Sequence, residues 1–364
     1  MKLLWPSLLW VFVLFSCASP YEAHLPVESN FPLKQNQIFS TDEVIKRIAV
    51  SDTWMVVYTP GTARIIDLDT KKILWETNLK IQADDPLAFV IVDEVLVATS
   101  ENQVVLMDKL GYKKTLTLAA PDEDTKDIIR VAAVYPDNIY LNRFPDWDLE
   151  AYKISQNAKQ WTLSVGRGTT DVFYDEITDV AYIPTRHESF FAVDNTTGEV
   201  LWKHDGSTIS TTYEDGVIYA VGMGSNSHSI RLSAFDVEKQ VELWQSEVTF
   251  SQYVYTMTVL NDLVVLSGNE GLLAVNKSDG AMLWQTPKGE SFMTKAVEYD
   301  GMIYAKGTSY MVYAISHQNG DFVGYLALEN NKSFEPEQDL VSGVYRVEDG
   351  IVFNTRHAVW LYKK

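Results

Sequence analysis

The sequence predicts an all-β protein, an eight-bladed β-propeller of four-stranded blades. A segment ending in tryptophan recurs about every 40 residues, and a period of this length is typical of propeller blades. Each unit contains short runs of β-branched and aromatic residues that follow Asp-Gly or Asn-Asp turns, as strands joined by tight turns do. No stretch shows a capped apolar pattern with a 3.6-residue period, so we expect almost no helix.

The repeat is clearest in three segments that align without gaps, FAVDNTTGEVLW, SAFDVEKQVELW and LAVNKSDGAMLW. In each of them an Asp or Asn lies eight residues before the final Trp. The same spacing separates Asp67 from Trp75 and Lys153 from Trp161. The marker positions are 67, 108, 153, 194, 236, 276 and 316, with spacings between 40 and 45 residues. This regularity predicts one structural unit repeated along the chain.

The blade number follows from the repeat length. Seven units carry the marker, and an eighth begins near Ser342 and reaches Lys364 after only its third strand. Segment 30–39 precedes the first complete blade and is free to supply the missing strand. Residues 31–364 divided into eight give about 42 per blade, which equals the repeat. We therefore expect the N-terminal strand to pair with the C-terminal three and close the ring, which removes open sheet edges.

The repeated tryptophans are expected to dock each blade on the next, rather than to form a ligand platform. A large flat side chain fills the outer gap between neighbouring blades, and its indole N–H can reach a carbonyl in the adjoining turn. These residues are Trp75, Trp161, Trp202, Trp244 and Trp284. Leu116 and the Gly324-Tyr325 pair stand at the same count in two other units, where we expect weaker junctions.

One unit carries almost the whole pattern A-x-D-x-x-T-G-x-x-x-W, in Ala192, Asp194, Thr197, Gly198 and Trp202. This pattern resembles the pyrroloquinoline quinone (PQQ) repeat, and the resemblance covers residues 48–364. The PQQ-like propeller family includes quinoprotein dehydrogenases and a non-enzymatic branch similar to the BamB outer-membrane assembly lipoprotein. The size and leader of this chain are similar to the second group. The resemblance implies a protein-binding or scaffold module that acts in outer-membrane protein assembly.

The enzymatic branch is tested by the cysteine count. Methanol-type quinoprotein dehydrogenases stack the cofactor between a Trp and a vicinal disulfide, and Cys17 is the single cysteine of this chain. The six histidines are scattered without metal-ligand spacing. We therefore predict no enzyme, and no catalytic residue, metal or cofactor. A ligand-binding or catalytic propeller that uses the channel mouth is the alternative.

The N-terminus is predicted to be an export signal. Residues 1–17 contain an apolar run from Leu3 to Phe15, too short to span a membrane and typical of a signal peptide. Leu14-Phe15-Ser16-Cys17 resembles a lipobox, which would make Cys17 the lipidated first residue of the mature chain. Cleavage by an ordinary signal peptidase around Ser16-Cys17-Ala18 is the alternative. Residues 18–29 are predicted to be a flexible stalk and 30–364 a single propeller domain. The protein is thus expected at the cell envelope, on its periplasmic or extracellular face.

The charge balance limits the partners. The chain has 49 acidic and 30 basic side chains and a net charge of −19. Nucleic-acid binding requires clustered Lys and Arg against phosphates, so no nucleic-acid partner is expected. The expected partners are an envelope protein and, through the lipid anchor alone, a membrane.

Two apparently long loops are candidates for partner contact, at residues 142–152 and 222–229. An aromatic side chain on a connecting loop is typical of an interface anchor. We therefore predict a contact patch of Phe144, Trp147 and Asp148. The alternative for Trp147 is that it folds back over its own blade.

Overall fold

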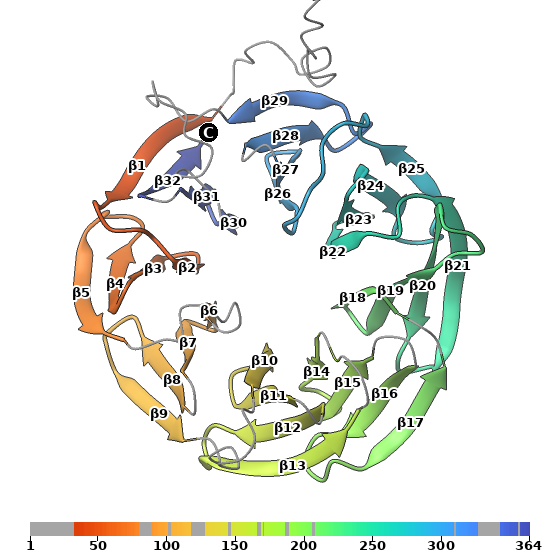
Figure 1. The fold of residues 1–364 in the computed structure, drawn as a ribbon, viewed down its shortest axis with the longest axis horizontal. Coiled ribbons are helices and arrows are strands. Elements are labelled where there is room, and N and C mark those ends of the chain that lie inside the picture. The colour runs from red at the N-terminus through yellow and green to blue at the C-terminus, as the bar shows by residue number, and fades with distance from the viewer. Residues whose placement is uncertain are drawn as a thin grey trace, which may run out of the picture.

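The computed structural model describes residues 33–79, 89–100, 103–117, 128–144, 147–165, 169, 171–185, 189–205, 208–308, 311–326, 343–355 and 357–364. The predicted signal peptide, stalk and lipidation site at Cys17 lie outside these residues. Within them the chain forms eight four-stranded antiparallel sheets and no helix. The sheets stand side by side around a common centre as the blades of a propeller (Figure 1). The described residues contain no helix long and apolar enough to cross a membrane.

Seven blades are continuous in sequence, and in each the first strand lies innermost and the fourth outermost (Figure 1). Blades one to four contain β2 (Arg47–Val50), β3 (Trp54–Thr59), β4 (Thr62–Asp67), β5 (Ile73–Asn78); β6 (Phe89–Val92), β7 (Val95–Ser100), β8 (Gln103–Asp108), β9 (Lys113–Thr117); β10 (Ile128–Val134), β11 (Asn138–Phe144), β12 (Asp148–Lys153), β13 (Ala158–Ser164); and β14 (Phe173–Asp175), β15 (Val180–Pro184), β16 (Ser189–Asp194), β17 (Val200–Asp205). Blades five to seven contain β18 (Ser210–Glu214), β19 (Val217–Met223), β20 (Ser229–Asp236), β21 (Val241–Thr249); β22 (Val254–Leu260), β23 (Leu263–Gly268), β24 (Gly271–Asn276), β25 (Met282–Gln285); and β26 (Val297–Tyr299), β27 (Met302–Lys306), β28 (Val312–Ser316), β29 (Phe322–Leu326).

The eighth blade joins the two ends of the described chain. Its strands are β30 (Val344–Val347), β31 (Gly350–Asn354), β32 (Ala358–Lys363) and β1 (Lys34–Ser40). Strand β1 pairs antiparallel with β32, from Lys34 opposite Lys363 to Ser40 opposite Ala358. The predicted closure of the ring by an N-terminal strand is therefore confirmed.

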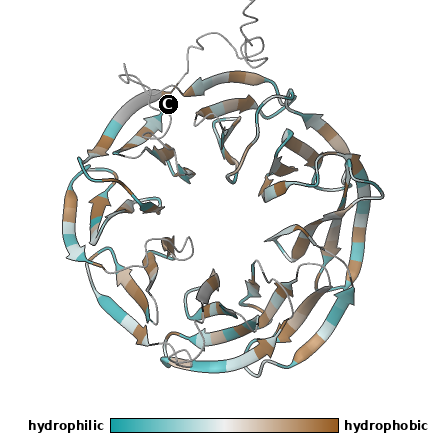
Figure 2. Cartoon of the chain, viewed as in Figure 1, coloured by the Kyte–Doolittle hydropathy of each residue, from teal (hydrophilic) through white to brown (hydrophobic). Residues whose placement is uncertain are grey.

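The core consists of apolar clusters that extend from each blade into the next. The second and third strands of the blades are almost wholly buried, as in β3 and β23. Both of their faces pack against neighbouring blades, and Figure 2 shows apolar segments concentrated on these middle strands. One cluster, for example, joins Val221 and Leu232 of blade five to Val264 and Leu273 of blade six. Such burial on both faces explains why these strands read as continuous apolar runs.

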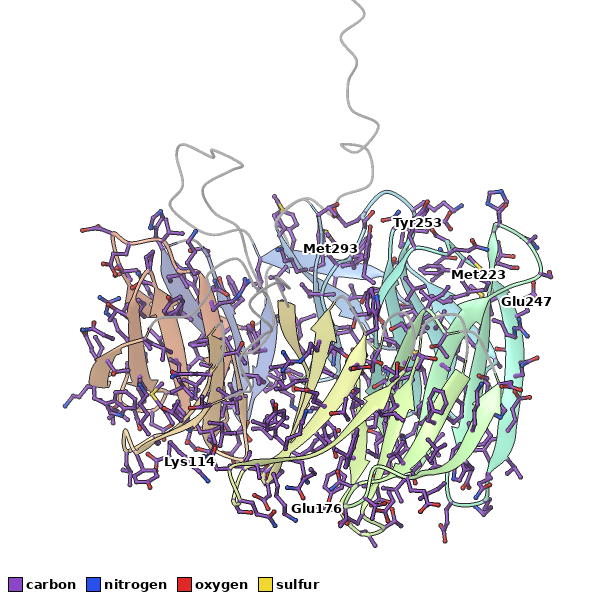
Figure 3. All side chains as sticks on the ribbon, turned by 60° about the horizontal axis from the view of Figure 1, so that its bottom comes forward. Lys114, Glu176, Met223, Glu247, Tyr253 and Met293 are labelled. Carbon is purple, nitrogen blue, oxygen red and sulfur yellow. The ribbon has the colours of Figure 1, made fainter. Side chains whose placement is uncertain are left out.

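Antiparallel pairing gives the ring two different faces. Turns between the first and second strands and between the third and fourth strands lie on one face, here called the turn face. Connections between the second and third strands, and from each blade to the next, lie on the opposite face, here called the loop face. Figure 3 shows Lys114 and Glu176 on the turn face and Met223, Tyr253 and Met293 on the loop face.

Candidate functional site

The repeated tryptophans lie on the outermost strands and dock each blade on the next. At four junctions the indole Nε1 donates a hydrogen bond to a backbone carbonyl in the turn after the third strand of the following blade. The bonds run from Trp75 to Lys109 (2.9 Å), Trp161 to Asn195 (2.7 Å), Trp244 to Lys277 (3.0 Å) and Trp284 to His317 (2.9 Å). Each of these four bonds links two neighbouring blades.

The Gly of the repeat lies beneath the Trp of the preceding blade. Gly198, Gly280 and Gly320 all have a positive φ, between 70° and 77°. A β-carbon on Gly198 would fall 2.7 Å from Trp161, and one on Gly320 would fall 2.6 Å from Trp284. The position therefore requires glycine for two reasons, a left-handed backbone and close approach to an indole.

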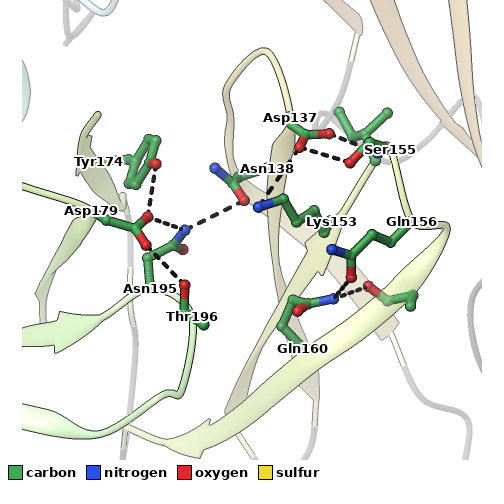
Figure 4. Close-up of polar contacts among 12 residues, drawn as sticks. Asp137, Asn138, Lys153, Ser155, Gln156, Gln160, Tyr174, Asp179, Asn195 and Thr196 are labelled. Carbon is green, nitrogen blue, oxygen red and sulfur yellow. Dashed lines mark hydrogen bonds and ion pairs between the residues drawn. The ribbon is translucent and has the colours of Figure 1, made fainter. Parts of the chain in front are cut away.

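Polar side chains fix the turn that presents this Gly and its carbonyl. At the junction of blades three and four, Asp179 accepts hydrogen bonds from Asn195 Nδ2 (2.9 Å), Thr196 Oγ1 (2.9 Å) and Tyr174 Oη (2.9 Å), as Figure 4 shows. Tyr140 donates to Asn195 Oδ1 across the junction (2.6 Å). Burial raises the pKa of the Asp179 carboxyl, but the three donors outweigh it and the net pKa is lowered. The carboxylate therefore stays ionised and holds Asn195 beneath Trp161.

The junction of blades four and five departs from this pattern. Here Gln240, with a φ of 55°, occupies the position of the Gly. Among the described residues Trp202 makes no hydrogen bond to a carbonyl of blade five, and it packs on Phe235 instead, with ring centroids 5.7 Å apart. Gln240 has a β-carbon where the turns beneath Trp161 and Trp244 have Gly, so Trp202 cannot approach this turn as closely as those tryptophans approach theirs.

The junction of blades two and three corrects a prediction. Counting eight residues from Asp108 gives Leu116, but the register places Lys114 at the Trp position, because it pairs with Leu106 as Trp284 pairs with Ala274. The turn after β8 is shorter than in the other blades, so the count overshoots by two. Lys114 Nζ donates to the Ile154 carbonyl, the acceptor that an indole reaches at other junctions. In blade seven the register does place Gly324 at the Trp position, opposite Ala314.

The two loops expected to be long are short. Strands β11 and β12 extend to Phe144 and from Asp148, so residues 142–144 and 148–152 are paired strand. Residue 147 has a φ of 62° and the Trp147 side chain is half-buried. Likewise, β19 and β20 leave only residues 224–228 between them. The expectation of long connectors was wrong because the polar and small residues in these segments belong to the ends of the strands. That Phe144, Trp147 and Asp148 contact a partner stays a prediction.

The loop face carries exposed apolar side chains over blades five to seven that sequence reasoning missed. Met223 is 48% exposed, Tyr253 69%, Tyr255 45% and Met293 55%. Three of them are labelled along the upper edge in Figure 3. They come from the end of β19, the connections between blades and the start of β22. We call these four residues the apolar loop patch. They fall outside the repeat, so the repeat gave no signal for them.

Hydrogen bonds fix the segments that carry the apolar loop patch. Asn269 joins two connections, since its backbone N–H donates to the Tyr253 carbonyl (3.1 Å) and its own carbonyl accepts from Ser291 Oγ (2.7 Å). The Tyr255 hydroxyl donates to Asn269 Oδ1. Gln252 Nε2 donates to the Asn226 carbonyl (2.9 Å) and so connects this region to the turn after Met223.

Glu247 stabilises the turn between β19 and β20. Its Oε1 accepts from the Ser225 backbone N–H (2.9 Å), the Ser225 hydroxyl (2.5 Å) and the Ser229 hydroxyl (2.6 Å). The Ser225 hydroxyl, the Ser229 hydroxyl and the Ser225 N–H lower the pKa of the Glu247 carboxyl to about 2. The turn beside Met223 is thus held by one ionised carboxylate.

No group of three or more His, Cys, Asp or Glu side chains is arranged to hold a metal ion within the described ranges. The buried carboxylate of Glu290 accepts hydrogen bonds from Tyr313 Oη (2.9 Å) and Thr308 Oγ1 (2.8 Å). It therefore fixes the connection that carries Met293. These polar groups of the loop face stabilise its backbone.

A ring of eight four-stranded blades with recurring Trp–Gly contacts at its junctions defines an eight-bladed β-propeller, as the sequence predicts. Residues 187–360 match the family model described as outer membrane protein assembly factor BamB. The fold is similar to the crystal structure of BamB from Moraxella catarrhalis, with a TM-score of 0.64 and 18% identity over 91% of this chain and 100% of that one.

The fold is also similar to that of a designed protein. The computationally designed Ika8 protein matches 90% of this chain and 98% of its own length, with a TM-score of 0.67 and 11% identity. At such identities the likeness shows the fold alone. No curated protein matches the sequence.

Proposed function

We propose that the chain is an exported, lipid-anchored scaffold that binds protein partners at the bacterial cell envelope and serves the assembly of outer-membrane proteins. The match of residues 187–360 to the BamB family model supports this direction. The apolar run from Leu3 to Phe15 and the single Cys17 support export and anchoring through a lipid. In this proposal residues 1–17 are removed or modified on export, 18–29 form the stalk, and the propeller is the working domain.

The observation that carries the proposal is the apolar loop patch. Exposed large apolar side chains that gather on one face mark a protein interaction site, and Tyr and Met are enriched in the cores of such interfaces. Shared hydrogen bonds through Asn269 and Gln252 hold the patch in place before a partner arrives. A prearranged surface loses little conformational entropy on binding. The patch is therefore suited to receive an apolar segment of another protein.

The test is affinity capture of the tagged, full-length protein from its own detergent-solubilised envelope, with identification by mass spectrometry. We expect a stoichiometric envelope protein that is lost when Tyr253 and Met293 are both changed to Ala. The matched control changes Ile177 and Leu243 to Ala, since these apolar residues are also exposed but lie on the turn face and the outer strand. Capture that survives the first variant but not the second would move the binding surface away from the loop face.

A second pair of variants tests the patch predicted from the sequence. Changing Phe144 and Trp147 to Ala should release the partner only if blade three also contributes to the interface. An empty eluate after gentle cross-linking, combined with stoichiometric uptake of PQQ and Ca²⁺ by the purified protein, would overturn the scaffold proposal in favour of a ligand-binding propeller.

A further inference from the structure

The junction of blades two and three contains a pocket of about 200 Å³ that opens to solvent. Its walls come from the ends of strands and turns that lie on the turn face. They are mostly apolar and include Val95, Leu106, Met107, Val134, Pro136 and Ile154. Lys114, Tyr112 and Asp108 add polar groups to the lining, and the Asp108 carboxylate accepts hydrogen bonds from the backbone N–H groups of Leu110 and Tyr112. Figure 3 shows Lys114 at the lower edge of the ring.

The repeat explains why the space is open. Four other junctions place the indole of a Trp at this position, with its Nε1 bonded to the turn of the next blade. Here Lys114 stands in register with those tryptophans, and its Nζ donates the equivalent hydrogen bond, to the Ile154 carbonyl. The aliphatic stem does not fill the volume of an indole, so an apolar pocket remains beside it.

Size and shape indicate an aromatic ring as the occupant. An apolar protein cavity of about 150 Å³ takes up benzene, and this pocket is somewhat larger. The pocket lies beside the residue that stands in register with the indoles of the equivalent junctions. The Lys114 ammonium lies at the pocket, where it can also interact with the face of a bound ring.

The rim indicates the charge of the occupant. Lys113 and Lys114 are adjacent in a chain whose net charge is −19, whereas the nearby Lys109 is already paired with Asp67 (3.0 Å). Leu110 and Tyr112, in the same turn, are 89% and 73% exposed. An exposed apolar rim beside these two lysines is complementary to an aromatic side chain with a neighbouring carboxylate.

We propose that this pocket is a second protein-docking site, which receives an aromatic side chain flanked by acidic residues from a partner. The incoming ring occupies the space that the protein's own Trp fills at four other junctions. The choice of a protein as occupant rests on the proposed function, whereas the pocket's preference for an aromatic ring does not. The site lies on the turn face, opposite the apolar loop patch, so both surfaces can be occupied together.

Free indole is the first probe, titrated into the purified full-length protein and followed by ligand-observed NMR. We expect saturable binding that Lys114→Trp weakens at least about tenfold, since the new indole fills the pocket and removes the burial available to the ligand. Lys113→Trp is the matched control, because residue 113 is exposed and neighbours the pocket without lining it. If Lys114→Trp does not fold, Val134→Phe narrows the same pocket from blade three.

Short labelled peptides then test the charge preference. Asp-Trp-Asp should bind at least about tenfold more tightly than Lys-Trp-Lys at low salt, and the difference should shrink as salt is added. Asp-Ala-Asp should not bind. Lys114→Met keeps the room for the ring and should retain indole binding while it reduces the preference for the acidic peptide.

Absence of saturable indole binding, or equal binding by the Lys114→Trp variant, would overturn the proposal. Equal binding of the acidic and basic peptides would overturn the part that concerns charge. These measurements use purified protein and no envelope partner, so their outcome is separate from that of the capture experiment on the loop face.

Discussion

Gly280 of blade six lies against the indole of Trp244 of blade five so closely that a β-carbon at residue 280 would fall 2.4 Å from Trp244 Cε3. The Trp244 Nε1 also donates to the Lys277 carbonyl in the same turn (3.0 Å). The Gly and the Trp of the motif thus belong to one contact between two blades, although within each repeat they stand four residues apart.

Changing Gly280 to Ala should destabilise the protein by about 2 kcal/mol or more, because the left-handed backbone and the clash with Trp244 both oppose a β-carbon. Gly301→Ala is the control, since Gly301 has a φ of 72° close to the 70° of Gly280 but no neighbour within 4 Å of its added β-carbon. Urea unfolding would measure both. Equal losses would show that backbone conformation, and not the contact with Trp244, accounts for the Gly.

Trp161→Phe should cost more stability than Trp202→Phe. The first change removes the bond to the Asn195 carbonyl and leaves a polar group unpaired, which costs about 1 to 3 kcal/mol. The second removes apolar contacts without such a bond. The comparison requires unfolding curves of both variants at one pH and salt concentration. A larger loss at residue 202 would contradict the importance of the carbonyl contact.

Gln240→Gly should stabilise the protein, in contrast to most substitutions in a turn. Residue 240 has a φ of 55°, and relief of the left-handed strain is worth about 1 kcal/mol. The change also gives the junction the Gly found beneath Trp161 and Trp244. Thermal unfolding and the tryptophan emission spectrum would follow the two effects. Lower stability would indicate that the Gln side chain has a stabilising contact of its own.

The turn beside Met223 should loosen in acid. The pKa of Glu247 is about 2 in the folded protein, against 4.5 for an ordinary glutamate. Since the folded pKa is lowered, the stabilisation is present above pH 4.5 and is lost as the pH falls toward 2. The protection factor of the Ser225 amide, which is its exchange rate by NMR divided into the intrinsic rate at the same pH, should fall as the carboxylate is protonated. In Glu247→Gln the protection factor should not change over this pH range. An unchanged protection factor in the native protein would rule out Glu247 as the group that holds the turn.

The fold could be predicted because the repeat has a physical cause. Where a Trp docks on the Gly of the next blade, both residues must stand at fixed places in their blades, so the spacing between Asp194 and Trp202 recurs wherever this contact recurs. The prediction failed at Lys114, where the turn after Asp108 is shorter and shifts the register. Sequence spacing counts residues along the chain, whereas docking depends on which residue lies opposite Leu106.

The candidate surfaces were harder to predict because their exposed apolar side chains do not recur with the repeat of about 40 residues. Tyr253 and Met293 lie in connections whose sequences differ from blade to blade, and nothing in their composition separates an exposed apolar side chain from a buried one. Trp147 illustrates the converse. Its place near two strand ends resembled an exposed loop, but the strands extend up to it and leave it half-buried.

The pairing of β1 with β32 also dictates the order in which the protein can mature. Lys34 lies opposite Lys363, so β1 cannot pair until β32, more than 300 residues later in the sequence, has been synthesised. Blades one to seven can assemble in turn from contiguous sequence, but blade eight cannot exist on an unfinished chain. Until then β1 and the outer face of blade one lack their partners, and an interrupted chain has the open edges that invite association with other molecules. Completion of the ring therefore requires the whole segment from β1 to β32.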